Sequence, residues 1–273
     1  MNQTVEIICV GNELLIGKTL NTNAQWLAKR ITHIGLTISR ITVVGDKISE
    51  ISDAITEAIK RKPEFILTTG GLGPTFDDMT LEGIAVGLGI SLKINQEALD
   101  MVKKKYLAYS LEDKKPFDLT PHRLKMAKFP KGATPLPNPV GTAPGVFIKF
   151  ENSKIFVLPG VPLEMKSIFD KSITLVMKER STEITFFEKS IESEGIMESS
   201  VAPLIDKVIE NNPRVYIKSH PKGTENFPFI EFHLSTKAKT IHKAEKDLNK
   251  ALNELIDFIK KNGGKIINEK IEN

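Results

Sequence analysis

Two consecutive segments near the start of the chain share one pattern, a run typical of a strand followed by an amphipathic stretch. The runs are Val5–Val10, which is apolar apart from Glu6, and Leu36–Val44, which is rich in β-branched residues; a third run, Phe65–Thr69, follows the second amphipathic stretch. Strands without polar–apolar alternation, with helices between them, indicate right-handed crossovers and a parallel sheet covered on both sides. We therefore predict an α/β fold, with a mostly parallel sheet that carries helices on both faces.

The rest of the chain predicts the remainder of this domain and a second one. Between residues 78 and 180 we expect helices at Asp78–Gly89 and Gln96–Ser110, an irregular loop at Ala133–Pro144, strands at Gly145–Phe150 and Lys154–Leu158, and a helix from about Pro162 to Arg180. Beyond it we expect a strand at Ile184–Ile191, a helix at Ile196–Ile209, strands at Val215–Lys218 and Phe229–Ser235, and a helix at Lys239–Lys261. The predicted domains are residues 1–180 and a small α+β domain of residues 181–273.

Composition excludes several classes of protein. The 38 Lys and Arg exceed the 34 Asp and Glu by only four charges, too small an excess to indicate a nucleic-acid binder. The single cysteine, Cys9, lies in an apolar run and has no disulfide partner within the chain. No apolar stretch approaches the roughly 18 residues of a membrane span. We expect a cytoplasmic homo-oligomer that has neither membrane nor nucleic acid as a partner.

Polar and glycine-rich segments follow or flank the predicted strands. They are Gly11–Gly17, Gly45–Asp46, Gly70–Asp78, Asn138–Gly145 and Pro159–Glu164. Ligands of open parallel sheets bind outside the carboxyl ends of the strands, which is where these segments would meet. The sequence therefore predicts a ligand site built from them.

The glycine-rich segment after the third apolar run carries the clearest chemical signal. Gly70, Gly71 and Gly73 would let backbone N–H groups approach phosphate oxygens closely. Asp77 and Asp78 would repel a bare phosphate, so the pair indicates a divalent cation such as Mg²⁺ that bridges carboxylate and phosphate. The alternative is that one of these aspartates caps the following helix.

The segment Gly11–Thr19 superficially resembles a P-loop. Five residues separate its two glycines, however, where a P-loop has four. We therefore exclude a P-loop nucleoside triphosphatase. Asn12 and Glu13 remain candidate polar contacts to a ligand, with the alternative that they only end the strand.

Several motifs together resemble the N-terminal-domain family of competence/damage-inducible protein A (CinA), itself similar to the molybdopterin-binding domains of molybdenum-cofactor biosynthesis proteins. These motifs are Gly11–Leu15, Asn21–Asn23, Thr69–Thr80, Asn138–Gly145, Leu158–Met165, Gly195–Ser199 and Ile217–Pro221. The nicotinamide-mononucleotide amidase domain that often follows in this family is missing from the sequence. Its deamidation activity is therefore not expected.

The resemblance implies a metal-dependent pyrophosphatase that cleaves the phosphoanhydride of ADP-ribose or a related dinucleotide such as FAD. The alternative is a protein of molybdenum-cofactor biosynthesis that binds molybdopterin or transfers adenylyl groups without hydrolysis. Mg²⁺, Mn²⁺ or Co²⁺ would serve as the cation. The small second domain leaves RNA binding, which its lack of a GXXG loop disfavours, and dimerisation as further alternatives.

Pattern and resemblance together assign roles to particular residues. We expect Asp46, Asp78 and Glu164 in catalysis and Asp77 and Asp78 on the metal; we expect Asn12, Glu13, Thr69, Gly70, Gly71, Gly73, Thr75, Gly141 and Gly160 around a phosphorylated, nucleotide-like ligand. For Glu164 the alternative is a solvent-facing glutamate that the dipole of its own helix stabilises.

Overall fold

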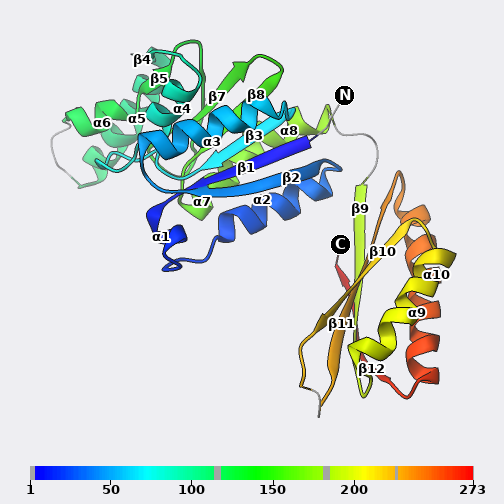
Figure 1. The fold of residues 1–273 in the computed structure, drawn as a ribbon. Coiled ribbons are helices and arrows are strands. Elements are labelled where there is room, and N and C mark those ends of the chain that lie inside the picture. The colour runs from blue at the N-terminus through cyan, green and yellow to red at the C-terminus, as the bar shows by residue number, and fades with distance from the viewer. Residues whose placement is uncertain (1–3, 114–117, 181–184, 225–226, 273) are drawn as a thin grey trace. The chain divides into compact units, whose positions relative to one another are not determined.

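The computed structural model describes residues 4–113, 118–180, 185–224 and 227–272. The chain divides into two compact units, one made of residues 1–31 and 36–181 and the other of residues 32–35 and 182–273. Each unit has its own sheet and its own hydrophobic core (Figure 1).

The sheet of the first unit has six strands in the order β2-β1-β3-β8-β7-β6. They are β1 (Thr4–Val10), β2 (Thr37–Val44), β3 (Phe65–Thr69), β6 (Thr134–Leu136), β7 (Gly145–Phe150) and β8 (Ser153–Leu158). Strands β2, β1, β3 and β8 are parallel to one another, whereas β7 and β6 are antiparallel to their neighbours. The prediction of a mostly parallel sheet is confirmed. The stretch expected to be wholly irregular between Ala133 and Pro144 contains the short edge strand β6.

Helices cover both faces of this sheet. They are α1 (Asn12–Leu15), α2 (Thr22–His33), α3 (Ile48–Lys60), α4 (Thr80–Gly87), α5 (Gln96–Asp113), α6 (Pro121–Lys125), α7 (Pro162–Ile168) and α8 (Thr174–Lys178). On one face α3, α4 and α5 pack with Ile8, Ile66 and Val157 of the strands in one core. Elsewhere α2 contacts the π-helical turn between α7 and α8, where the rings of Trp26 and Phe169 meet edge to face at 5.4 Å.

The central strands β1 and β3 are largely apolar because both of their faces are covered. All five residues of β3 are buried, as are six of the seven residues of β1. A strand covered on both faces gains from apolar side chains at every position, because successive side chains point to opposite faces. The buried polar exceptions in these two strands are Glu6, Thr68 and Thr69.

A small antiparallel pair of strands lies outside the main sheet. It joins β4 (Leu92–Ile94) to β5 (Lys128–Pro130), so that Lys93 pairs with Phe129. The sequence predicted neither strand, because three residues are too few for a periodic pattern. This pair contacts α4, and together these elements line a second cavity.

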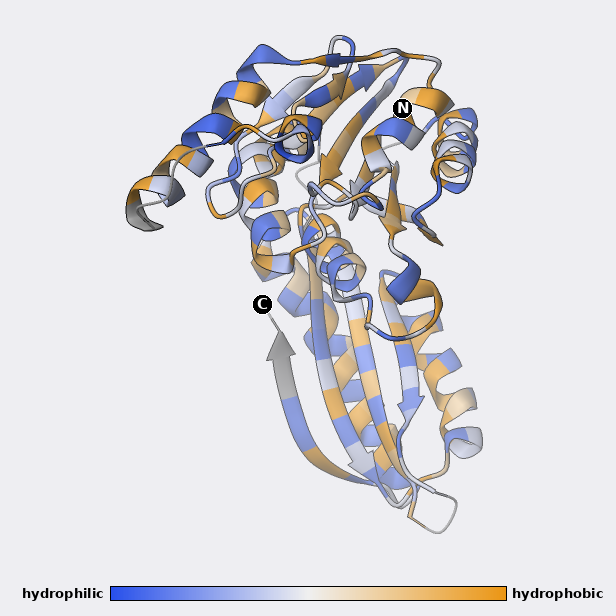
Figure 2. Cartoon of the chain, turned by 90° about the vertical axis from the view of Figure 1, so that its left-hand side faces the viewer, coloured by the Kyte–Doolittle hydropathy of each residue, from blue (hydrophilic) through white to orange (hydrophobic). Residues whose placement is uncertain are grey.

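The second unit is an antiparallel sheet with two helices. Its strands β9 (Thr185–Glu194), β10 (Val215–Pro221), β11 (Phe229–Ala238) and β12 (Lys265–Glu272) lie in the order β10-β11-β9-β12, and its helices are α9 (Glu198–Asn211) and α10 (Ile241–Lys261). Buried and partly exposed residues alternate along β11, whose inward residues share a core with α9 and α10 (Figure 2). The predicted α+β character is confirmed. The predicted strand start at Ile184 lies outside the described residues.

None of the helices in the described ranges combines the length and the apolar character that crossing a membrane requires.

Candidate functional site

A cavity of about 310 Å³ opens at the carboxyl ends of the parallel strands. Its walls come from Val10 and Gly11 at the end of β1, from Asp46 after β2, from Thr69 to Gly71 at the end of β3 and from Gly160 after β8. Four of the five segments predicted to form the site therefore line this cavity. The fifth, Asn138–Gly145, contributes none of the lining residues.

The glycine turn after β3 has a conformation that only glycine accommodates at two successive positions. Gly70 has a φ of 111°, and a Cβ there would lie 2.1 Å from the carbonyl oxygen of Val10. Gly71 has a φ of 66°, and its Cβ would lie 2.2 Å from Oγ1 of Thr80. The turn can therefore pass between β1 and the start of α4 only because both residues lack side chains.

The hydrogen bonds of the turn decide which backbone groups a ligand can reach. The N–H of Gly70 donates to the carbonyl of Leu158 at 3.0 Å, so this amide is not available to phosphate. Among the described residues, none accepts a hydrogen bond from the N–H of Gly71 or Leu72. The described residues therefore leave the amides of Gly71 and Leu72 without an acceptor.

Thr75 holds the two adjacent aspartates of the turn. Its Oγ1 lies 2.5 Å from both Oδ1 of Asp77 and Oδ2 of Asp78, and its N–H donates to Oδ2 of Asp78 at 2.8 Å. The hydroxyl hydrogen bond lowers the pKa of Asp77 below its ordinary value. Helix α4 has Met79 as its N-cap, with no side-chain cap. The alternative that Asp77 or Asp78 caps this helix is therefore wrong.

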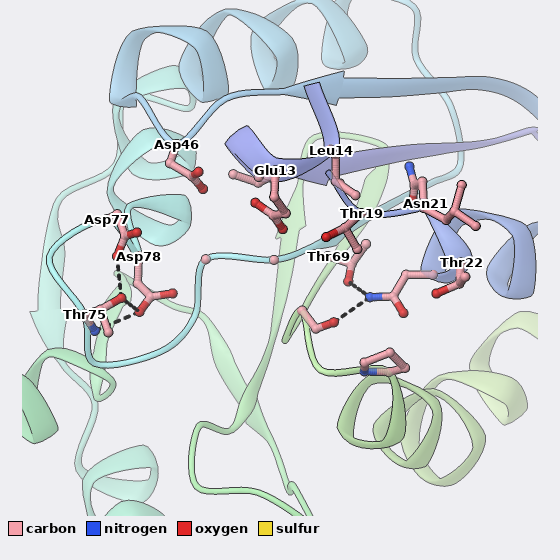
Figure 3. Close-up of a pocket in the computed structure, with 18 residues that line it drawn as sticks. Glu13, Leu14, Thr19, Asn21, Thr22, Asp46, Thr69, Thr75, Asp77 and Asp78 are labelled. Carbon is pink, nitrogen blue, oxygen red and sulfur yellow. Dashed lines mark hydrogen bonds between the residues drawn. The ribbon is translucent and has the colours of Figure 1, made fainter. Parts of the chain in front are cut away.

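Asp46 faces these aspartates from the end of β2. Figure 3 shows its carboxylate directed into the same space as those of Glu13, Asp77 and Asp78. Burial raises the pKa of Asp46 above its ordinary value, the hydrogen bond from the N–H of Asn12 opposes this, and the three neighbouring carboxylates raise it further. The carboxylates of the cavity are thus close enough to repel one another.

The charged side chains that line the cavity are all acidic. Its described lining includes four carboxylates, those of Glu13, Asp46, Asp77 and Asp78, and no Lys, Arg or His. Within the described residues no three His, Cys, Asp or Glu side chains converge on a complete metal site. Mg²⁺ is usually held by one or two carboxylates together with waters and ligand phosphates. These side chains therefore fit a cation that is shared with a bound phosphate, and do not fit a cation held by protein alone.

Asn23 joins three of the segments that form the cavity. Its Nδ2 donates to Oγ1 of Thr69 at 3.1 Å and to the carbonyl of Gly160 at 2.8 Å (Figure 3). The Thr69 hydroxyl in turn donates to the carbonyl of Pro159 at 2.9 Å. Thr69 is therefore engaged in holding β3 to the segment after β8. Sequence reasoning included Asn23 in a motif but missed this role, for which the only signal was a polar side chain near the start of an amphipathic helix.

Glu164 and Gly141, both predicted at the site, lie together but outside the cavity lining. Nδ2 of Asn138 donates to Oε2 of Glu164 at 2.6 Å, while Oδ1 of Asn138 accepts from the N–H of Gly141 at 2.8 Å. A Cβ at Gly141 would lie 2.0 Å from the Glu164 carboxylate. The geometry thus differs from a catalytic placement, because this glutamate binds the loop Asn138–Gly145 to the first turn of α7.

Gly73 also lies apart from the first cavity. It lines a neighbouring one, and a Cβ there would approach Oδ2 of Asp78 to 2.7 Å. Gly73 therefore leaves room for the Asp78 carboxylate, and it contributes no wall to the acidic cavity.

The segments at the rim of the sheet, where the cavity opens, also carry exposed apolar side chains. They are Leu15, Ile16, Leu20, Phe76 and Leu163. Large exposed apolar residues that gather beside a polar cavity are typical of a surface that binds a partner or a ligand. The predicted homo-oligomer stays a prediction.

The sequence of the chain is similar to a known domain family and to proteins of other organisms. Residues 6–179 match a family model described as a probable molybdopterin binding domain. A protein of Pyrobaculum aerophilum is 44% identical over 255 residues, which are 93% of each chain, and one of Pyrobaculum arsenaticum is 42% identical over 259 residues, 94% of this chain and 95% of the relative. The names of these relatives state no activity.

A solved structure shows the same kinship. The crystal structure of the protein CinA from Thermoplasma acidophilum is 44% identical in sequence, has a TM-score of 0.57 and covers 62% of this chain and 94% of its own. The family model spans well over half of the 273 residues and nearly all of the first unit. The chain therefore belongs to the family of molybdopterin-binding-like domains, in its CinA-like branch.

Proposed function

We propose that the acidic cavity binds a phosphorylated pterin or nucleotide together with a divalent cation. The observation that carries this proposal is the lining of four carboxylates without a basic side chain, to which Gly71 adds a free amide. Phosphate would be repelled by this lining unless a cation lay between the two. The family description, a probable molybdopterin binding domain, supports a phosphate-bearing pterin as one such ligand.

Different residues of the cavity would bind the cation and the phosphate. Asp77 and Asp78, held by Thr75, would ligate the cation, and the amide of Gly71 would meet a phosphate oxygen. A divalent cation supplies Lewis acidity that polarises a phosphoanhydride. Asn23 would keep the walls formed by Thr69 and Gly160 at a fixed separation.

Hydrolysis of ADP-ribose or FAD is the reaction we propose for this site. One observation favours hydrolysis over binding alone, namely that the Asp46 carboxylate faces Asp77 and Asp78 and so would lie beside the cation. A carboxylate in that position is placed to accept a proton from a water that attacks the phosphoanhydride. Transfer of an adenylyl group to a pterin would use the same cation and the same phosphate contacts.

Product analysis tests the proposal. The full chain is incubated with ADP-ribose or FAD and with Mg²⁺, Mn²⁺ or Co²⁺, and the products are separated chromatographically. We expect AMP and ribose 5-phosphate from ADP-ribose, with loss of most turnover in Asp78→Asn. Asp53→Asn, on the exposed surface of α3, is the matched control and should keep full activity.

The outcomes separate binding from hydrolysis. Calorimetric titration of the same nucleotides, with and without the metal, accompanies the product analysis. Metal-dependent binding without products would contradict hydrolysis and leave the binding proposal standing. Absence of metal-dependent binding, or equal binding by wild type and Asp78→Asn, would contradict both.

A further inference from the structure

A second cavity of about 440 Å³ lies beside the acidic one. Gly71 and Asp78 line both cavities, so the glycine turn forms a shared wall. The remaining walls of the second cavity come from α4, from the β4–β5 pair and from the end of α6. The two cavities therefore adjoin the same turn.

The second cavity is lined by basic side chains, which the first cavity lacks. Lys93, Lys125 and Lys128 line it, against the two carboxylates of Asp78 and Glu82. Lys125 donates to the carbonyl of Thr75 and so holds the turn. The ammonium groups of Lys93 and Lys128 have no hydrogen-bond or ion-pair partner among the described residues. Two cationic groups on neighbouring strands are thus left for an external anion.

The rest of the second cavity is apolar. Leu72 and Met126 are buried, Leu81 and Leu92 are half-buried, and all four line it. Cavities that combine an apolar lining with a few polar groups recognise small molecules that have an apolar or ring-shaped body. Lysine adds an ammonium group at the end of an apolar stem. The lining therefore suits an anion carried on a ring, and not a bare inorganic ion.

We propose that this second cavity is an anion subsite that needs no metal and holds a negatively charged group on a ring-shaped arm of the ligand. The inference rests on the proposed function for the ligand's other end, since the shared wall of Gly71 and Asp78 would lie between the two groups. It narrows the substrate class to molecules with two anionic groups, of which one meets the cation and the other meets Lys93 and Lys128.

The test uses pterin-6-carboxylate as a fluorescent probe that carries one anion on a planar ring. Its binding to the full chain is titrated in EDTA, where the acidic cavity has no cation. We expect binding that Lys93→Glu and Lys128→Glu each weaken at least about tenfold, because each replaces an attractive charge with a repulsive one. Lys131→Glu, exposed on the segment after β5 and outside the cavity lining, is the matched control and should leave binding unchanged.

A second pair of variants guards against loss of folding. Lys93→Gln and Lys128→Gln remove the charges without introducing repulsion, and the unfolding midpoint of each variant is compared with that of Lys131→Glu. We expect the glutamine variants to weaken binding less than the glutamate variants while their midpoints stay unchanged. A neutral probe, 6-hydroxymethylpterin, should bind more weakly than the carboxylate and show no dependence on either lysine.

Failure of this inference and failure of the proposed function give different results. If pterin-6-carboxylate does not bind in EDTA, or if Lys131→Glu weakens it as much as Lys93→Glu, the subsite is wrong whatever ADP-ribose does. If the probe binds as expected but ADP-ribose shows no metal-dependent binding, the subsite stands and the proposed function of the acidic cavity is wrong.

Discussion

Asn12 and Asp46 bind each other across the carboxyl ends of β1 and β2. The N–H of Asn12 donates to Oδ2 of Asp46 at 2.7 Å, and Oδ1 of Asn12 accepts from the N–H of Asp46 at 3.4 Å. This reciprocal pair fixes the Asp46 carboxylate over the cavity although burial and three nearby carboxylates raise its pKa. The negative charge of Asp46 therefore lowers the stability of the folded protein.

Asp46→Asn should therefore be more stable than wild type at neutral pH. A carboxyl whose pKa is higher in the folded than in the unfolded state stabilises the fold when protonated, and this contribution is lost as pH rises through the folded pKa. Asparagine keeps the acceptor for the N–H of Asn12 but never ionises. Chemical unfolding should show an advantage of Asp46→Asn at pH 7 that disappears below the ordinary pKa of about 4. Lower stability than wild type at pH 7 would contradict the burial argument.

Arg61 neutralises a carboxylate inside the sheet. Its Nε and terminal guanidinium nitrogen donate to the two carboxylate oxygens of Glu6, both at 2.7 Å, and the Glu6 side chain is only 3% exposed. Arg61→Ala should lower the free energy of unfolding by about 3 kcal/mol, because it leaves the buried Glu6 carboxylate without a partner. Arg30→Ala, which breaks the exposed pair with Asp170, should cost less than about 1 kcal/mol. Equal losses in urea unfolding would show that Glu6 is solvated.

Gly70 and Gly17 both have positive φ, at 111° and 69°, but differ in their surroundings. A Cβ at Gly70 would meet the Val10 carbonyl oxygen at 2.1 Å, whereas a Cβ at Gly17 has nothing within 4 Å. Gly17→Ala should cost only the backbone penalty of about 1–2 kcal/mol. Gly70→Ala should cost clearly more and abolish metal-dependent binding, since the turn must move. Unfolding titrations of both variants compare the two costs, and a Gly70→Ala that matches Gly17→Ala would mean that the turn relaxes freely.

Glu164→Gln separates two roles for this residue. If Glu164 holds the loop through Asn138, as its 2.6 Å hydrogen bond indicates, glutamine retains an acceptor oxygen, and ligand binding and turnover stay near wild type. Glu164→Ala should then lower stability by about 1 kcal/mol. Turnover and unfolding are measured on both variants. Loss of turnover in Glu164→Gln with unchanged stability would restore the catalytic role expected from the sequence.

Periodicity predicted the larger elements well and the small ones poorly. The hairpin of β7 and β8 was evident because a polar turn at residues 151–153 separates two apolar runs. Strand β12 (Lys265–Glu272) was missed because it lies at the edge of its sheet and its sequence is polar. The helix expected from Pro162 to Arg180 contains a π-helical turn at Phe169–Ile173, which shifts the hydrogen bonding without interrupting the apolar pattern.

Location of the site followed from the sequence, because the carboxyl ends of parallel strands must share one edge of a sheet. Residues attached directly to those strand ends, such as Asp46 and Gly70, therefore line the cavity. Glu164 follows a strand end too, yet its side chain turns to Asn138. Side-chain direction depends on which partners a neighbouring loop offers, and a linear pattern does not contain that information.

The sequence by itself determined the layered α/β architecture and the concentration of glycines and aspartates in the loop after β3, since burial and backbone freedom act position by position. Only the tertiary structure decided that the N–H of Gly70 donates to the carbonyl of Leu158 and that four carboxylates line one cavity. It also decided that three lysines line the neighbouring cavity. These are contacts between residues distant in the chain. The interaction between two charges weakens with distance, so these contacts act only after folding has brought the residues together.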